Sequence, residues 1–125
     1  MVKFGTLEYF KKYAEAVNKD EHMSKSGFST TNLIVIENGE EKAFFFKIEN
    51  GKITEVREGS PDEKTEFGTR GKYDVWVKVI KGEIDAEVAT NKGMLKAKYK
   101  MLKALRNRKT LGRLLQIYGE IEAEY

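Results

Sequence analysis

The chain has 125 residues, of which 40% are hydrophobic and 34% are charged, and this length favours a single domain over residues 1–125. Cysteine is absent, which excludes disulfide bonds, thiolate metal sites and cysteine nucleophiles. Twenty-three Lys and Arg residues against 20 Asp and Glu residues give a net charge of +3, which is too small by itself to indicate a nucleic-acid-binding protein.

The composition also gives expectations about source and location. The charged fraction exceeds the usual quarter of residues, and Lys and Glu dominate it, as in many thermophile proteins. Met1–Thr6 carries no basic region followed by an apolar stretch, and no window approaches the ~20 apolar residues that span a bilayer. We therefore expect a cytoplasmic protein from a thermophile, and a melting temperature typical of mesophiles would contradict the second part.

The first predicted element is an amphipathic helix with Thr6 as its N-cap. Its apolar residues recur at every third or fourth position between charged neighbours: Leu7, Phe10, Ala14 and Val17. The polar, turn-prone stretch Asn18–Gly27 follows, and it is expected to be a surface loop that contains His22, the only histidine.

Three strands joined by two tight turns are predicted next. The turns are the dipeptides Asn38-Gly39 and Asn50-Gly51, which tolerate the positive φ angles of hairpin corners. The strands cover Asn32–Glu37, Lys42–Glu49 and Lys52–Glu58. Alternate residues of a strand share a face, so the middle strand places one apolar set on the same side of the sheet: Phe44, Phe46 and Ile48.

The second half of the chain begins with a loop around Pro61 and a short strand at about Lys64–Arg70. Tyr73–Ile84 fits a helical face and an alternating strand equally well, while its β-branched content favours the strand. The remaining pattern predicts a strand over Met94–Tyr99 and an amphipathic helix over Leu111–Ile121. Between them, Met101, Leu102 and Leu105 begin a helical pattern.

No arrangement of catalytic or metal-binding residues stands out. Gly68-Thr69-Arg70-Gly71 is too short for a phosphate-binding loop, and no nucleophile elbow occurs. His22 has no nucleophile near it in the sequence, so it is expected to be a solvated surface residue. The carboxylates Glu83, Asp85 and Glu87 lack the spacing of a calcium loop. The sequence favours a protein that is not an enzyme, with no cofactor, metal or catalytic residue.

Positive charge is concentrated between Lys96 and Arg113, where no acidic residue occurs; we call this segment the basic stripe. It is typical of a solvated surface, of contact with anionic lipid headgroups, or of contact with nucleic-acid phosphates. Interleaved apolar residues favour lipid or membrane contact, and Tyr99 is the one aromatic residue there that could stack on a base. The cations within the stripe are Lys98, Lys100, Lys103, Arg106, Arg108 and Lys109.

Aromatic bulk is the second feature of interest. Phe44, Phe46 and Trp76, together with the apolar stripe of the last helix, form either an ordinary core or the lining of a binding cavity. The sequence leaves both possibilities open.

The order of elements and one spacing pattern resemble the sterol carrier protein 2 family of lipid-binding domains. Gly82-Glu83-Ile84-Asp85 is followed, at the family's distance, by the basic-apolar strand Gly93–Lys98. Tyr73-Asp74-Val75-Trp76 resembles the aromatic-bearing helix of prokaryotic members, and the hairpin Phe44–Val56 matches the family's second and third strands. The likeness covers about residues 6–121. The chain departs from the pattern at two positions, Ala86 for a frequent proline and Tyr99 for a glycine that usually ends the strand.

This resemblance implies an α+β fold, with a five-stranded, mostly antiparallel sheet covered by helices and an apolar tunnel between the sheet and the C-terminal helices. It implies a helix for Tyr73–Ile84. It also implies a function: the non-catalytic binding and transfer of fatty acids, fatty acyl thioesters, isoprenoids or sterols. Such binding is driven by removal of apolar surface from water, at roughly 25 cal/mol per Å².

On this interpretation the partner is an apolar small molecule, a fatty acyl or isoprenoid lipid, and a transient membrane contact accompanies its transfer. Lys100, Lys103 and Arg106 are candidates for contact with a headgroup or membrane. The alternative is a small nucleic-acid-binding module that uses the basic stripe, and a third class is an enzyme or an accessory domain of one. The candidates for lining the ligand site are Phe44, Phe46, Ile48, Trp76, Ile80, Met94, Leu102, Leu105, Leu114, Leu115 and Tyr118.

Overall fold

The computed structural model describes residues 1–125. The N-terminal part contains β1 (Val2–Lys3), α1 (Leu7–Lys19) and α2 (Glu21–Ser26). Four strands follow: β2 (Thr30–Glu37), β3 (Glu41–Glu49), β4 (Lys52–Gly59) and β5 (Phe67–Lys72). The rest of the chain forms α3 (Tyr73–Ile80), α4 (Ala86–Asn91), β6 (Leu95–Lys98), α5 (Met101–Arg106), α6 (Arg108–Tyr118) and β7 (Ala123–Glu124).

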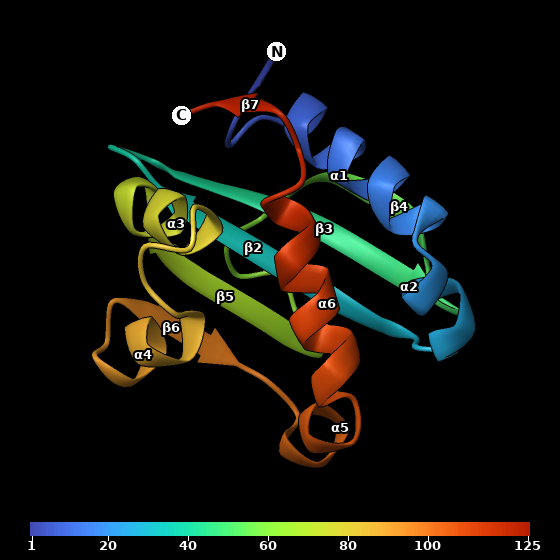
Figure 1. Ribbon diagram of the computed structural model, residues 1–125. Helices are drawn as coiled ribbons and strands as arrows, with labels where there is room; N and C mark the ends of the chain where they lie inside the picture. The colour runs from blue at the N-terminus through green and yellow to red at the C-terminus, as the bar shows by residue number, and fades with distance from the viewer.

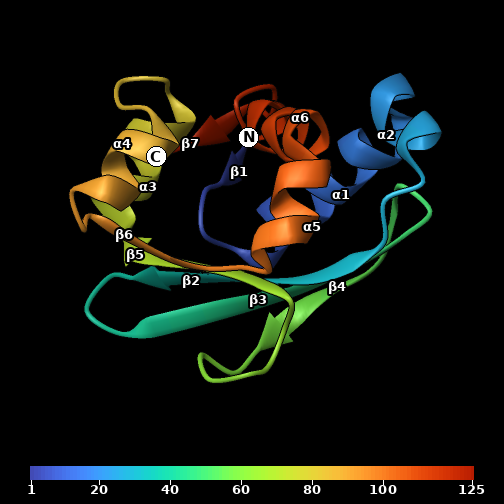
Figure 2. The ribbon, with the colours of Figure 1, turned by 90° about the horizontal axis from the view of Figure 1, so that it is seen from below.

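The main sheet has five strands in the order β4-β3-β2-β5-β6, and only the β2–β5 pair is parallel. All helices lie on one face of this sheet, with α1 and α2 on one side of α6 and with α3 and α4 on the other (Figure 1). The connection from β4 to β5 passes beneath the opposite face (Figure 2). The α+β fold with a mostly antiparallel five-stranded sheet is therefore confirmed.

Helix α1 begins where the sequence predicts, because the side-chain oxygen of Thr6 accepts a hydrogen bond from the Tyr9 amide at 3.2 Å. The predicted surface loop over residues 18–27 is wrong in part, since α2 forms within it. Asp20 caps this helix by accepting a hydrogen bond from the Met23 amide at 3.1 Å, and Met23 is fully buried. One apolar residue in a polar stretch gives no periodicity, so the sequence did not reveal α2.

The two predicted hairpins are confirmed, with positive φ angles at Gly39, Asn50 and Gly51. The predicted apolar set of β3 faces the helices and belongs to the main core. On the other face, the guanidinium of Arg57 lies 4.2 Å from the ring centroid of Phe45. Phe45 belongs there to a second, smaller apolar cluster with Leu33, Val35 and Ala43.

Of the segment with two possible structures, Tyr73–Ile80 forms a helix, α3, as the resemblance implies, and the helix ends four residues before Ile84. Its buried residues, Val75, Trp76 and Val79, lie at helical spacing against the core, which overrides the strand preference of its valines. The next helix, α4, is capped by Asp85, whose carboxylate accepts hydrogen bonds from the amides of Glu87 and Val88. Ala86 takes the first position of α4, where proline would also fit.

Candidate functional site

A cavity of about 190 Å³ lies between the sheet and the helices. Thirteen of its 16 lining residues are hydrophobic, and none carries a charge. The strands contribute Asn32, Ile34, Phe46, Ile48, Ile53, Thr69 and Leu95. The helices contribute Tyr13, Trp76, Val79, Ala86, Thr90, Leu111, Leu114, Leu115 and Tyr118. Such a lining suits an apolar molecule, because a buried charge would find no partner in it.

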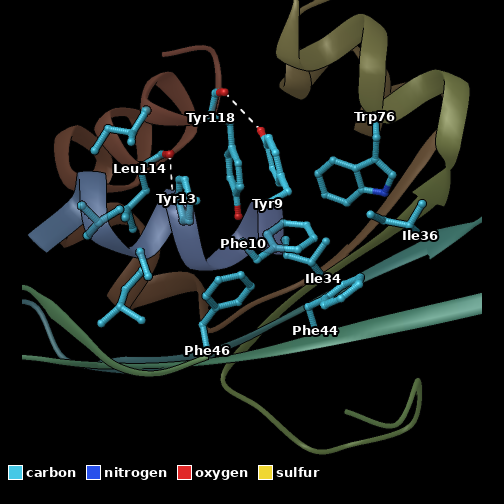
Figure 3. Packing of buried hydrophobic residues seen from close by; sticks show 14 of the residues in the cluster. Tyr9, Phe10, Tyr13, Ile34, Ile36, Phe44, Phe46, Trp76, Leu114 and Tyr118 are labelled. Atoms are coloured by element: carbon cyan, nitrogen blue, oxygen red, sulfur yellow. Dashed lines mark hydrogen bonds between the residues drawn. The ribbon is translucent and has the colours of Figure 1, made fainter. Parts of the chain in front are cut away.

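One helix, α6, supplies four of the lining residues at a spacing that puts them on a single face: Leu111, Leu114, Leu115 and Tyr118. Two tyrosines of α1 attach this helix to the rest of the core, as Figure 3 shows. The hydroxyl of Tyr9 donates to the carbonyl of Tyr118 at 3.2 Å, and that of Tyr13 donates to the carbonyl of Leu114 at 2.8 Å.

These tyrosines are neutral at physiological pH. Burial raises the pKa of Tyr13 and of Tyr118 well above the ordinary value of 10.0, and it does the same for the pKa of Tyr9. The rings of Tyr13 and Tyr118 stack with centroids 3.8 Å apart and planes 2° from parallel. The protonated hydroxyls thus serve as hydrogen-bond donors that hold α6 against α1.

Trp76 joins α3 to the sheet at the opposite side of the cavity. Its indole Nε1 donates to the backbone carbonyl of Val35 at 3.1 Å, and the ring is 4% exposed. A Cβ at the neighbouring Gly71 would collide with the side chain of Leu95, while its 3.5 Å distance to the Trp76 indole nitrogen would be an ordinary contact. Gly71 of β5 therefore makes room for Leu95 of β6 next to the indole.

Three polar side chains border the otherwise apolar cavity. The Thr90 hydroxyl donates to the carbonyl of Ala86 at 2.8 Å, so it is used within α4. Asn32 lies on β2 and Thr69 on β5, the two parallel strands. Asn32 is opposite Phe67, and Thr69 is the second residue after Phe67. Strand geometry puts both on the helix-facing side of the sheet. They are the polar groups that could bond to a polar end of a bound molecule.

The cavity brings together six of the eleven predicted lining residues: Phe46, Ile48, Trp76, Leu114, Leu115 and Tyr118. Phe44 lies fully buried in the same core, with its ring centroid 4.5 Å from that of Phe10. Ile80 and Met94 are half-buried at the edge of the core. Leu102 and Leu105 are exposed on α5, and the structure does not bring them to the cavity.

Ten further lining residues were not predicted. A sequence signal exists for some of them: Ile34 shares a strand face with Ile36, and Tyr13 lies on the apolar stripe of α1. Thr69, Ala86 and Thr90 have no such signal, because small and polar residues do not mark a buried face.

The basic stripe is partly used in ion pairs within the protein. Lys100 and Lys103 both bind the carboxylate of Glu66, at 3.2 and 2.6 Å. Lys103 also donates to the carbonyl of Ser29, and the hydroxyl of Thr30 donates to Glu66 at 2.7 Å. Arg113 pairs with Asp20 at 2.6 Å and with Glu120 at 2.7 Å, whereas Arg106 is exposed. Hydrogen bonds lower the pKa of Glu66 from 4.5 to about 2, and the bond from Lys103 has a larger effect than the bond from Thr30.

Glu66→Gln is expected to remove a pH-dependent part of the stability. Because the pKa of Glu66 is lower in the folded than in the unfolded state, its stabilisation is complete above pH 4.5 and is lost as pH falls toward about 2. The melting temperature of the wild type should exceed that of the variant at about pH 7, and the two should converge near pH 2.

Circular dichroism melts over this pH range measure the effect of Glu66→Gln, with Glu49→Gln as the control. Glu49 pairs with Lys47 at 3.2 Å in an exposed position, and such pairs contribute about 0–1 kcal/mol. A Glu66→Gln melting temperature that equals the wild-type value at neutral pH would contradict the role of Glu66.

His22 is an exposed residue whose Nε2 lies 3.2 Å from the hydroxyl of Thr110, so it lies on the surface and joins α2 to α6. No helix combines the length and apolar character needed to cross a bilayer. No three His, Asp or Glu side chains gather as they would around a metal ion.

No protein-family model matches the chain, and no curated protein matches it in sequence. Solved structures do match it. A crystal structure of sterol carrier protein 2 superposes with a TM-score of 0.83 at 13% identity, over 96% of this chain and 100% of that one. A Thermus thermophilus protein described as possibly a sterol carrier protein gives a TM-score of 0.81 at 13% identity, over 99% and 93%.

Two further matches differ in what they represent. A palmitated sterol carrier protein 2-like protein from Aedes aegypti gives a TM-score of 0.59 at 9% identity, over 94% of this chain and 95% of that one. An alkylsulfatase from Pseudomonas gives 0.59 at 17% identity, but the chain covers only 16% of that enzyme. These likenesses extend over nearly the whole chain for the carrier proteins. The chain has the α+β fold of sterol carrier protein 2.

Proposed function

We propose that this protein binds lipids or other apolar molecules in the cavity and transfers them without changing them chemically. The observation that carries the proposal is the cavity lining, which is largely hydrophobic and free of charge. The palmitated fold neighbour supports a fatty acyl chain as one ligand class. Fatty acyl thioesters, isoprenoids and sterols are the other apolar classes that suit such a lining.

The size of the cavity limits how a ligand binds. About 190 Å³ is less than the roughly 300–1,000 Å³ of common ligand pockets, so a long chain enters only if the surrounding helices move apart. Each CH₂ group that leaves water contributes about 0.8 kcal/mol toward this opening. A hydroxyl, ester or carboxyl end of the ligand would bond to Asn32 and Thr69.

A binding function without catalysis accords with the chemistry of the cavity. No carboxylate, histidine or lysine borders it, and burial raises the pKa values of its two tyrosines, so neither tyrosine serves as a base near neutral pH. The nucleic-acid alternative is not favoured, because Lys100, Lys103 and Arg113 already bind carboxylates of the protein. Contact of Lys100, Lys103 and Arg106 with a headgroup stays part of the proposal. For the two lysines it requires exchange of Glu66 for the headgroup.

Leu115→Trp tests the proposed site. Leu115 borders the cavity from α6, and the larger indole would occupy the space that the ligand needs. We expect about a tenfold or greater loss of affinity for a fluorescent fatty acid, equivalent to losing the burial of about two CH₂ groups. Titration of the fluorescent probe, and native mass spectrometry of the gently purified protein, measure the binding.

Leu102→Trp is the matched control, since the same substitution at an exposed position of α5 leaves the cavity unchanged. It should bind the probe in solution as the wild type does. The proposal fails if the wild type neither carries a lipid nor takes up fatty acids, or if both tryptophan variants bind equally well.

A further inference from the structure

Helix α5 presents its apolar side chains to solvent. Met101, Leu102 and Leu105 are 65%, 69% and 58% exposed, and no residue of α5 is buried. Helical geometry places these three within one arc of the helix, while Lys103 and Ala104 point the other way, toward the protein. This is the reverse of an ordinary surface helix, whose apolar side packs against the core.

Ion pairs, together with the packing of Ala104 against the core, hold α5 in this orientation. Lys103 on its inner side, with Lys100 just before it, binds Glu66, and the Lys103 ammonium lies 5.7 Å from the ring centroid of Phe28. The apolar arc therefore stays available to a partner. Figure 1 shows α5 at the end of α6 that lies farthest from the two chain termini.

The charge around α5 limits what that partner can be. No acidic residue occurs between Glu87 and Glu120, while nine Lys and Arg residues do. Arg106 of α5 and Lys109 at the start of α6 are exposed. A partner that satisfies both features presents an apolar layer next to negative charge, which describes a bilayer with anionic headgroups.

We propose that α5 docks the protein on anionic membranes. Met101, Leu102 and Leu105 would lie at the boundary of the hydrocarbon, and the exposed Arg106 and Lys109 would contact the lipid phosphates. The inference rests on the proposed function, because it identifies the surface from which the apolar ligand is taken. A second copy of the chain fits less well, since a symmetric contact through α5 would bring two sets of cations together. Nucleic acid offers phosphates but no apolar layer for the leucines.

Co-sedimentation with vesicles tests this inference with no ligand present. We expect binding to phosphatidylcholine vesicles that contain roughly 30% phosphatidylserine, little binding to phosphatidylcholine alone, and weakening by salt. Leu102→Ser combined with Leu105→Ser should reduce the binding about tenfold or more, since two leucines no longer enter the apolar layer. Both side chains are exposed, so the variant should melt as the wild type does.

Val88→Ser is the control, because Val88 is a 42% exposed apolar residue on α4, outside the proposed surface. It should bind vesicles as the wild type does. The inference is overturned if the wild type does not bind anionic vesicles, or if the double-serine variant binds them as strongly as the wild type does. A dimer in sedimentation equilibrium that the double-serine variant dissociates also overturns it. Fatty-acid titration without vesicles reports separately on the cavity, so a failure there is distinguishable from a failure of docking.

Discussion

Replacing Trp76 with alanine is expected to lower the free energy of unfolding by about 3–5 kcal/mol. The ring is almost fully buried between α3 and the sheet, and its removal leaves a void that the surrounding helices fill only in part. The backbone carbonyl of Val35 also loses its hydrogen bond from the indole. Urea or guanidinium unfolding curves, followed by circular dichroism, measure the loss.

Two controls separate the contributions to this loss. Trp76→Phe keeps an aromatic ring but has no donor for Val35. Its free energy of unfolding should therefore lie between those of the wild type and Trp76→Ala. Tyr99→Ala removes an aromatic ring that is 52% exposed, and it should stay within about 0.5 kcal/mol of the wild type. If Trp76→Ala costs no more than Tyr99→Ala, Trp76 does not anchor α3.

Local signals were sufficient for α1 and the two hairpins, but not for α2. The Thr6 cap, the Asn-Gly turns and the alternation in β3 each act over a few residues, and the structure shows all of them. The helix α3 required more than local information. Its valines favour a strand, but only a helix places Val75, Trp76 and Val79 together against the core. The family resemblance predicted the helix, which the composition of the segment did not.

The candidate site was predictable to the extent that apolar periodicity marks it. The spacing along α6 identified Leu114, Leu115 and Tyr118, which border the cavity. The same reasoning included Leu102 and Leu105, because an apolar pattern does not say which side of a six-residue helix faces the protein. That side is chosen by the pairing of Lys100 and Lys103 with Glu66, which is 34 or more residues away in the sequence.

Gly51→Ala is expected to destabilise the protein by about 3 kcal/mol or more, whereas Gly39→Ala should cost only about 1–2 kcal/mol. Both glycines sit at hairpin corners with a φ of 80°, so both substitutions carry the same left-handed backbone strain. Their surroundings differ. A Cβ at Gly39 meets nothing within 4 Å, while one at Gly51 would overlap the carbonyl oxygen of Met23 at α2. Unfolding curves of the two variants isolate the cost of this overlap.

The overlap at Gly51 has a consequence for the cavity, because α2 supports the helix that forms one of its walls. Displacing α2 weakens the hydrogen bond from the Gly51 amide to the carbonyl of Phe28 and moves Asp20 away from Arg113 on α6. Gly51→Ala should therefore weaken fatty-acid binding as well as stability, while Gly39→Ala should leave binding unchanged. Equal losses of stability in the two variants would show that α2 moves freely, and that the turn's backbone strain alone sets the cost.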